Sequence, residues 1–149
     1  MQDPHRALRA LALKSLARRS LTVHELRQRL LRTGAEEPGV EATLAWLARE
    51  GLVDDAALAA RQVELAAERA EGPLRLVASL RARGVDPDTI RAALSGAQPE
   101  AEAAARAAER YLRTHPGLDD GLRRRRLGGF LRRRGFHSDV IAEVVGEDD

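Results

Sequence analysis

The residues of this sequence that are best suited to chemistry are two neighbouring carboxylates and a few histidines. Asp54 and Asp55 could hold Mg²⁺ or act as general acid and base. They follow Gly51 at the expected start of a helix, however, where acidic side chains cap backbone N–H groups. The histidines are His5, His24, His115 and His137. Because their spacing is not that of metal ligands, we expect no metal site and no cofactor.

Other groups on which enzymes depend are missing from the sequence. There is no cysteine, which excludes a thiol nucleophile, a cysteine-ligated zinc site and a disulfide framework. The single lysine, Lys14, lies outside any G-x-x-x-x-G-K-[ST] sequence, which excludes a phosphate-binding P-loop. We therefore predict that the chain is not an enzyme and takes no small-molecule substrate.

Arginine is the main chemical feature of the chain. Seven arginines and no acid lie between Gly121 and Gly135, although the formal net charge of the chain is only +2. Consecutive residues on a helix point around all sides, so some of these guanidiniums must face away from the core. Guanidiniums bind phosphate and carboxylate groups. We therefore predict a binding surface for a partner protein or DNA at Arg123, Arg124, Arg125, Arg126, Arg132, Arg133 and Arg134.

Two further arginines are candidates for the same surface. Arg81 and Arg83 occupy places before Gly84 equivalent to those of Arg132 and Arg134 before Gly135. A row of such residues could extend the binding surface along the molecule. The alternative interpretation is a solvated face on an arginine-rich protein.

These arginines belong to a repeat of about fifty residues. The pattern L-x3-L-x3-G-x5-[VI]-x3-[LV] starts at Leu26 and again at Leu76 and Leu127. Leucines four residues apart share one helix face, a glycine closes the helix in the left-handed conformation, and the next aliphatic residues start a second helix. Each copy is therefore expected to form helix, glycine turn and helix, and the turn glycines are Gly34, Gly84 and Gly135.

Local signals mark the starts of these helices. Thr22 and Glu25 have the spacing of a capping box. Asp86 stands before a proline in the first turn of the next expected helix. In the third copy, we expect Ser138 or His137 to cap the second helix of the pair.

Three more helical stretches separate the pairs, at residues 4–18, 54–70 and 99–113. The abundance of Ala, Leu, Arg and Glu agrees with helices, and no apolar run is long enough to span a membrane. We predict an all-α fold of three tandem three-helix repeats, about nine helices, in an elongated, curved array. The predicted repeats are residues 1–52, 53–97 and 98–149, the last with an acidic C-terminal tail. The scarce aromatic residues Trp46, Phe130 and Phe136 are expected to pack in the core.

The chain resembles the RecX family in the order and spacing of several motifs. These are Thr22-x-x-Glu25-Leu26, Gly51-Leu52-Val53-Asp54-Asp55, Gly72-Pro73, Leu80-x3-Gly84-Val85 and Arg133-Arg134-Gly135-Phe136. The resemblance covers nearly the whole chain. This sequence departs from the family pattern in having Leu58 in place of the usual Phe, Thr22 in place of Ser, and almost no lysine.

The resemblance implies a cytoplasmic regulatory protein without enzymatic activity. Its partner would be the RecA recombinase filament, and it would inhibit strand exchange and DNA-dependent ATP hydrolysis. It would thereby modulate homologous recombination, DNA repair and the SOS response to DNA damage. Single- or double-stranded DNA, if contacted, would be contacted through its backbone.

A DNA-binding protein built from helix-turn-helix-like pairs is the alternative function. The expected second helices argue against it, because residues 89–94 and 139–144 lack the Asn, Gln and Arg clusters that read base edges. A passive helical scaffold or a membrane-surface protein is disfavoured by the polar, acid-rich middle and end of the chain.

Overall fold

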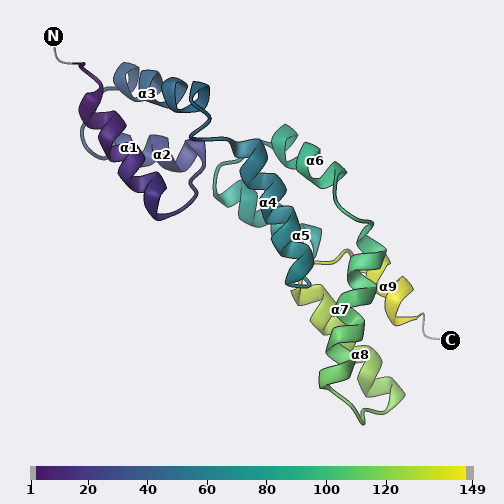
Figure 1. Cartoon of the computed structure of the whole chain (residues 1–149). Helices are drawn as coiled ribbons and strands as arrows, with labels where there is room; N and C mark the ends of the chain where they lie inside the picture. The colour runs from purple at the N-terminus through teal and green to yellow at the C-terminus, as the bar shows by residue number, and fades with distance from the viewer. Residues whose placement is uncertain (1–2, 147–149) are drawn as a thin grey trace. The chain divides into compact units, whose positions relative to one another are not determined.

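The computed structural model describes residues 3–146, and over that range the chain forms nine α-helices and no β-strand (Figure 1). The helices are α1 (Arg6–Arg18), α2 (Val23–Leu31), α3 (Glu37–Arg49), α4 (Asp55–Glu68), α5 (Pro73–Ala82), α6 (Pro87–Ser95), α7 (Glu100–Thr114), α8 (Asp120–Arg133) and α9 (Ser138–Val145). The all-α prediction is confirmed. The three helical stretches expected between the pairs correspond to α1, α4 and α7.

The chain divides into two compact units. The first contains the residues up to Ala59 together with Leu80–Ile90, and the second contains Ala60–Ser79 together with the residues from Arg91 onward. Helices α4, α5 and α6 each have residues in both units. The repeat boundaries after residues 52 and 97, and the elongated array, stay predictions. Most acids of the expected C-terminal tail, residues 147–149, lie outside the described residues.

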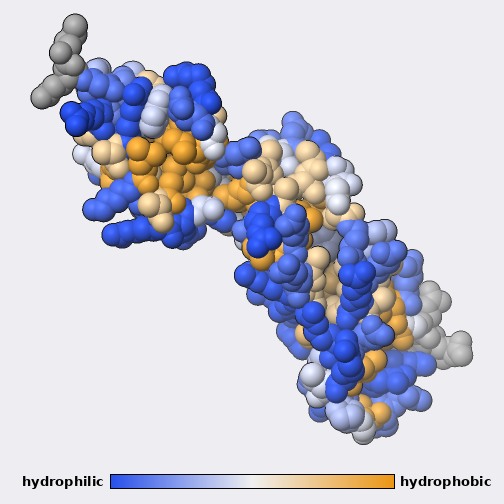
Figure 2. All heavy atoms as spheres, in the orientation of Figure 1, coloured by the Kyte–Doolittle hydropathy of each residue, from blue (hydrophilic) through white to orange (hydrophobic). Residues whose placement is uncertain are grey.

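The core of the first unit joins α1, α2 and α3, which contact one another. Its buried residues are Ala12, Leu21, Leu26, Leu30, Val40, Leu44, Leu47 and Val53. The repeat leucines Leu26 and Leu30 are completely buried, as expected for one shared helix face. Trp46 packs against this core, and the Arg9 guanidinium carbon lies 4.5 Å from the centre of its ring. Figure 2 shows apolar side chains gathered on the visible face of these three helices, bordered by hydrophilic ones.

The second unit has its core where α7, α8 and α9 contact one another. The buried residues are Ala104, Ala107, Ala108, Leu127, Leu131, Phe136 and Ile141. Three alanines on α7 let the neighbouring helices approach closely, and Phe136 fills the space beside them at 2% exposure. Phe130 packs partly buried against the same cluster. The core position predicted for Phe136 is therefore confirmed, whereas Trp46 and Phe130 pack partly buried against the cores.

The three turn glycines adopt the left-handed conformation that the repeat predicts. Their φ angles are +85° at Gly34, +80° at Gly84 and +92° at Gly135. Non-glycine residues rarely adopt this region, because their Cβ atoms crowd the backbone. At Gly84 a Cβ atom would also lie 2.3 Å from the His24 side chain. At Gly135 a Cβ atom would lie 2.6 Å from the backbone of Arg75. Packing as well as the φ angle therefore requires glycine at Gly84 and at Gly135.

Two of the three caps expected for the helices of the repeat pairs are present. The Thr22 hydroxyl accepts from the Glu25 N–H at 3.1 Å, and the Glu25 carboxylate accepts from the Thr22 N–H at 3.0 Å, which completes a capping box. Asp86 accepts the Thr89 N–H at 3.0 Å.

The cap predicted for α9 is wrong. His137 takes the N-cap position, but its side chain caps no N–H group of the described residues. Its ring instead lies 2.9 Å from a carboxylate oxygen of Glu100 on α7, and that carboxylate also accepts the His137 N–H at 2.8 Å. Ser138 is already the first residue of the helix. The N–H of the N-cap residue is therefore satisfied by a side chain from a distant helix, and the local side-chain cap is not formed.

Gly128 and Gly129 do not interrupt α8, which runs continuously through them. Gly128 is buried, and a Cβ atom there would lie 4.0 Å from Ile141 of α9, an ordinary van der Waals distance. Among residues 3–146, no helix combines the length and the apolar character needed to cross a membrane.

Candidate functional site

The arginine-rich surface is built on α8, whose two ends are fixed by local interactions. At its start, the Asp119 carboxylate accepts the Leu122 N–H at 2.9 Å and caps the helix. At its end, Arg132 and Arg133 place positive charge where the helix dipole is negative. Leu127 on the inner face is buried, so the remaining faces carry the arginines into solvent.

Six of the seven predicted arginines of this segment are exposed. They are Arg123, Arg124, Arg125, Arg126, Arg132 and Arg133, and we call them the α8 arginine surface. Arg123 lies 3.5 Å from Asp120, one turn earlier on the helix, and both side chains are largely exposed. An exposed pair of this kind is weak, so Asp120 does little to neutralise the surface.

Two open cavities border the α8 arginine surface. One, of about 550 Å³, lies between α8 and α9 and is lined by Arg124, Arg125 and Arg132 together with Ile141. The other, of about 430 Å³, is lined by Arg125, Arg126, Gly129 and Arg133 together with Tyr111 and His115 of α7 and its C-terminus. Guanidiniums on two sides of one helix can therefore engage two separate anionic groups.

The second cavity has an aromatic wall that the sequence analysis missed. The ring centres of Tyr111 and His115 are 4.0 Å apart and stacked, and Tyr111 also stacks on Phe130 at 4.7 Å. The sequence does contain a signal, because residues four apart on a helix share one face.

Arg134 is not part of the exposed surface. Its Nε donates to the carbonyl oxygen of Ala70 at 3.1 Å, and its guanidinium also hydrogen-bonds the carbonyl oxygen of Arg69. These carbonyls belong to the end of α4, where a helix leaves its last C=O groups without partners. Arg134 therefore satisfies backbone groups inside the second unit.

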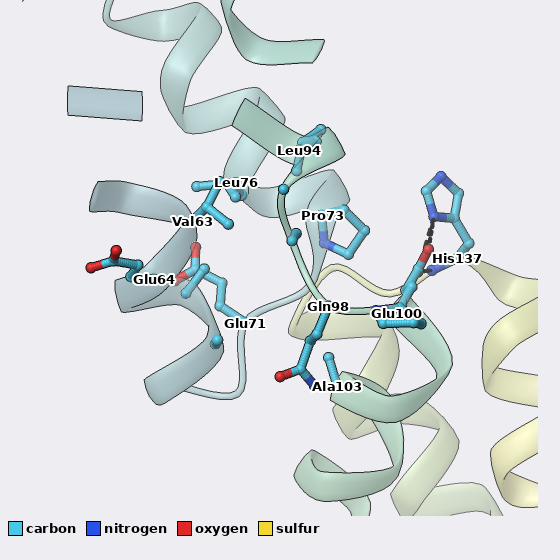
Figure 3. Close-up of a pocket in the computed structure, with 15 residues that line it drawn as sticks. Val63, Glu64, Glu71, Pro73, Leu76, Leu94, Gln98, Glu100, Ala103 and His137 are labelled. Atoms are coloured by element: carbon cyan, nitrogen blue, oxygen red, sulfur yellow. Dashed lines mark hydrogen bonds and ion pairs between the residues drawn. The ribbon is translucent and has the colours of Figure 1, made fainter. Parts of the chain in front are cut away.

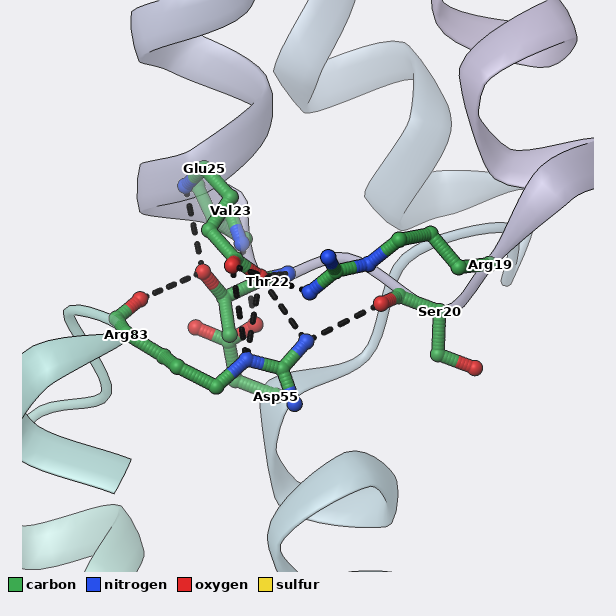
Figure 4. A network of polar contacts seen from close by, with 7 residues as sticks. All are labelled: Arg19, Ser20, Thr22, Val23, Glu25, Asp55 and Arg83. Carbon is green, nitrogen blue, oxygen red and sulfur yellow. Dashed lines mark hydrogen bonds and ion pairs between the residues drawn. The ribbon is translucent and has the colours of Figure 1, made fainter. Parts of the chain in front are cut away.

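Arg81 and Arg83 belong to the first unit and differ in exposure. Arg81 is exposed. The Arg83 guanidinium, by contrast, lies 2.9 Å from the Glu25 carboxylate and donates to the carbonyl oxygen of Ser20 at 3.0 Å (Figure 4). The Thr22 hydroxyl completes the contact by donating to the carbonyl oxygen of Arg83 at 2.6 Å. Arg83 thus holds the start of α2 against the end of α5.

Glu25 lies at the centre of this network and is held in its charged form. Burial is the largest single influence and opposes its ionisation, but hydrogen bonds from Arg83 and from the Thr22 N–H favour the charged form. The charges of Arg83 and Arg19 act in the same direction, and together they lower the pKa of Glu25 below its ordinary value of 4.5. The network therefore stabilises the fold, and this stabilisation depends on pH.

The two neighbouring carboxylates form helix contacts and do not converge on a ligand. Asp54 accepts the Ala57 N–H at 3.0 Å and caps α4, as predicted. Asp55 accepts the N–H of Val23 at 3.0 Å and so satisfies the first residue of α2 (Figure 4). Among residues 3–146, no three His, Asp or Glu side chains come together as metal ligands would.

Comparison with known proteins identifies the family of the chain. Residues 9–47, 54–94 and 98–145 match the first, second and third three-helix domains of RecX, in that order. A regulatory protein RecX of Halorhodospira halophila is 40% identical over 147 residues, covering 96% of this chain and 91% of the relative. A regulatory protein RecX of Thermobifida fusca is 37% identical, covering 99% of this chain and 81% of the relative.

Solved structures share the fold. The crystal structure of RecX from Lactobacillus salivarius superposes with a TM-score of 0.83 at 19% identity, covering 95% of this chain and 94% of that one. A crystal structure of a regulatory protein RecX gives a TM-score of 0.79 at 25% identity, covering 97% of this chain and 73% of that one. The chain belongs to the RecX family of regulatory proteins.

Proposed function

We propose that this chain binds the RecA recombinase filament and inhibits its strand exchange and DNA-dependent ATP hydrolysis. Such a protein would act in the cytoplasm, without chemistry of its own, and would restrain homologous recombination, DNA repair and the SOS response. Membership of the RecX family supports a regulatory role. The observation that carries the proposal is the α8 arginine surface, which presents six exposed arginines on one helix to an acidic partner.

The chemistry of this surface fits a nucleoprotein filament. A filament presents both acidic side chains and DNA phosphates, and guanidiniums bind either group through paired N–H donors. The two cavities on either side of α8 place Arg132 and Arg126 on different faces of the helix. One helix could therefore contact a protein groove and a phosphate backbone at the same time.

Hydrolysis of ATP by RecA from the same organism provides the test. RecA is assembled on single-stranded DNA, this chain is titrated in, and ATP hydrolysis is measured beside its binding to bare DNA. We expect hydrolysis to fall at chain concentrations that leave bare DNA largely unbound. Unchanged hydrolysis with the chain in excess over RecA would contradict the proposal.

Direct binding to DNA is the second candidate function. The cavity with stacked Tyr111 and His115 beside Arg126 and Arg133 favours it, because base stacking and phosphate contact often combine in single-strand binding. His115→Ala should then weaken binding to bare single-stranded DNA by about fivefold or more, since stacking contributes about 1 kcal/mol or more per base. If His115→Ala binds single-stranded DNA as tightly as the original chain, His115 does not stack on bases, and contacts to the DNA backbone remain as the explanation.

A further inference from the structure

The second unit contains a cavity on which the proposed function does not depend. It has a volume of about 500 Å³ and lies between α4, α5 and the segment that joins α6 to α7 (Figure 3). This volume is within the range of ligand-binding pockets in proteins, about 300 to 1000 Å³. We propose that it binds a segment of a partner protein in which one apolar side chain is flanked by arginine or lysine.

Apolar side chains from three helices form most of the cavity wall. Val63 of α4, Leu76 of α5 and Leu94 of α6 line it, together with small residues such as Ala67. Small residues leave the volume open, and larger aliphatic ones give it an apolar surface. An apolar side chain that enters the cavity therefore removes surface from water on both partners.

Carboxylates surround this apolar wall. Glu64, Glu71 and Glu100 all line the cavity, and His137 is the only lining residue that can carry a positive charge. Figure 3 shows Glu100 directed toward His137. Its carboxylate lies 2.9 Å from the ring nitrogen Nδ1 of His137 and accepts a hydrogen bond from the His137 backbone N–H. The carboxylates of Glu64 and Glu71 favour a cationic partner segment over an anionic one.

A cationic partner can displace the present partners of these two acids. Glu64 lies 3.0 Å from Arg61, and both side chains are more than 60% exposed. Glu71, whose side chain is 19% exposed, lies 3.6 Å from Arg75, which is 53% exposed. Because Arg61 and Arg75 are both more than half exposed, an arginine of the partner can replace either at small cost.

Labelled synthetic peptides provide a direct test with the whole chain. The first peptide carries a central leucine with two arginines on each side, the second has alanine for leucine, and the third has glutamates for the arginines. Fluorescence anisotropy should show saturable binding of the first peptide. The alanine peptide should bind about fiftyfold more weakly, because a leucine side chain buries about three more carbon groups. The glutamate peptide should not bind.

Variants of the chain locate the binding site. Ala67→Trp fills the cavity and should abolish binding, whereas Ala105→Trp, at an exposed position of α7 outside the cavity, should not. Glu64→Lys should weaken binding about fivefold, as expected for an exposed charge pair of about 1 kcal/mol. Glu109→Lys changes the net charge equally, outside the cavity lining, and should have no effect.

Three results would overturn the proposal: no saturable binding of the leucine peptide, equal binding of the leucine and alanine peptides, or equal binding by Glu64→Lys and Glu109→Lys. If Ala67→Trp fails to fold, Glu64→Lys still decides, since the Glu64 side chain is 66% exposed. Because the assay contains neither RecA nor DNA, its outcome is separate from that of the ATP hydrolysis experiment.

Discussion

The backbone N–H of Gly72 donates a hydrogen bond of 2.6 Å to the carbonyl oxygen of Arg134, although the two residues are far apart in the sequence. A Cβ atom on Gly72 would lie 2.4 Å from the backbone of Gly135, a distance that real Cβ atoms do not adopt. Backbone cannot give way as a flexible side chain can. The close approach of these two segments therefore requires glycine at position 72.

Gly72→Ala should lower the free energy of unfolding by about 1 to 3 kcal/mol, the usual effect of overpacking. Gly128→Ala is the matched control, because Gly128 is helical and a Cβ atom there meets Ile141 only at 4.0 Å. It should be neutral or stabilise the chain by up to about 1 kcal/mol. Urea unfolding measures both variants, and equal stability for the two would contradict the close approach at Gly72.

Valine substitutions at the three turn glycines should distinguish the turns that pack against another residue from the turn that does not. Gly84→Val and Gly135→Val should each lower the melting temperature, because left-handed strain of about 1 kcal/mol or more adds to a clash with His24 or Arg75. Gly34→Val should have a smaller effect, since no described atom lies within 4 Å of a Cβ there. If Gly84→Val and Gly135→Val both melt like the original chain, the helix-turn-helix assignment of the repeats fails.

The Glu25 network should make the stability of the first unit depend on pH. The pKa of Glu25 is lowered in the folded state, so the folded state binds fewer protons than the unfolded one as pH falls below 4.5. The stabilisation is therefore present above pH 4.5 and is lost as pH falls through the lower, folded pKa. Glu25→Gln should be less stable than the original chain by about 1 to 2 kcal/mol at neutral pH, and the difference should shrink in acid.

Urea unfolding between pH 7 and pH 3 measures that difference. Glu41→Gln serves as the control, because Glu41 pairs with Arg27 but its side chain is 54% exposed. The pKa of Glu41 is also lowered by the hydrogen bond from Arg27, so the same direction applies with a smaller effect. A difference for Glu25→Gln that stays constant over this range would show that its charge does not stabilise the fold.

Local features of this fold could be predicted from the sequence, and long-range ones could not. Thr22 and Glu25 are three residues apart, so their capping box has a sequence signature. The hydrogen bond from Thr22 to Arg83 has none, because it depends on how α2 meets the end of α5. The same holds for the Glu100 carboxylate of α7, which accepts the backbone N–H of His137.

In the candidate site, too, local features could be predicted from the sequence and long-range ones could not. The exposure of the α8 arginines follows from their crowding on one helix, which local geometry dictates. That Arg134 alone turns inward depends on the carbonyl oxygens of Arg69 and Ala70, which lie on another element. The acid-lined cavity also escaped prediction, since Glu64, Glu71 and Glu100 come from three separate segments with no common spacing.

The repeat itself makes a prediction about overall dimensions in solution. A compact globule of this length would have a radius of gyration of about 15 Å, whereas three stacked helical units should exceed about 18 Å. Small-angle X-ray scattering measures this quantity directly. A value near the lower figure would reject the elongated array and leave the three-helix repeats packed as one body.

The α8 arginines should be required for binding to the RecA filament and should contribute little to the stability of the fold. Replacing Arg124, Arg125, Arg132 and Arg133 with alanine leaves the buried Leu127 in place, and exposed charges contribute within about 1 kcal/mol each. The helical circular-dichroism signal and the melting temperature should therefore change little. Inhibition of RecA ATP hydrolysis should weaken and lose much of its dependence on salt, because contacts to phosphates or acidic side chains are screened by ions.

A second quadruple variant separates the α8 arginine surface from total charge. It replaces four exposed arginines outside α8 with alanine: Arg6, Arg18, Arg49 and Arg113. Both variants carry the same net charge, so a general electrostatic attraction to the filament would weaken equally in the two. We expect the α8 variant alone to lose inhibition. If it inhibits like the original chain across salt concentrations, the α8 arginines are only a solvated face, and the binding surface must be sought elsewhere in the molecule.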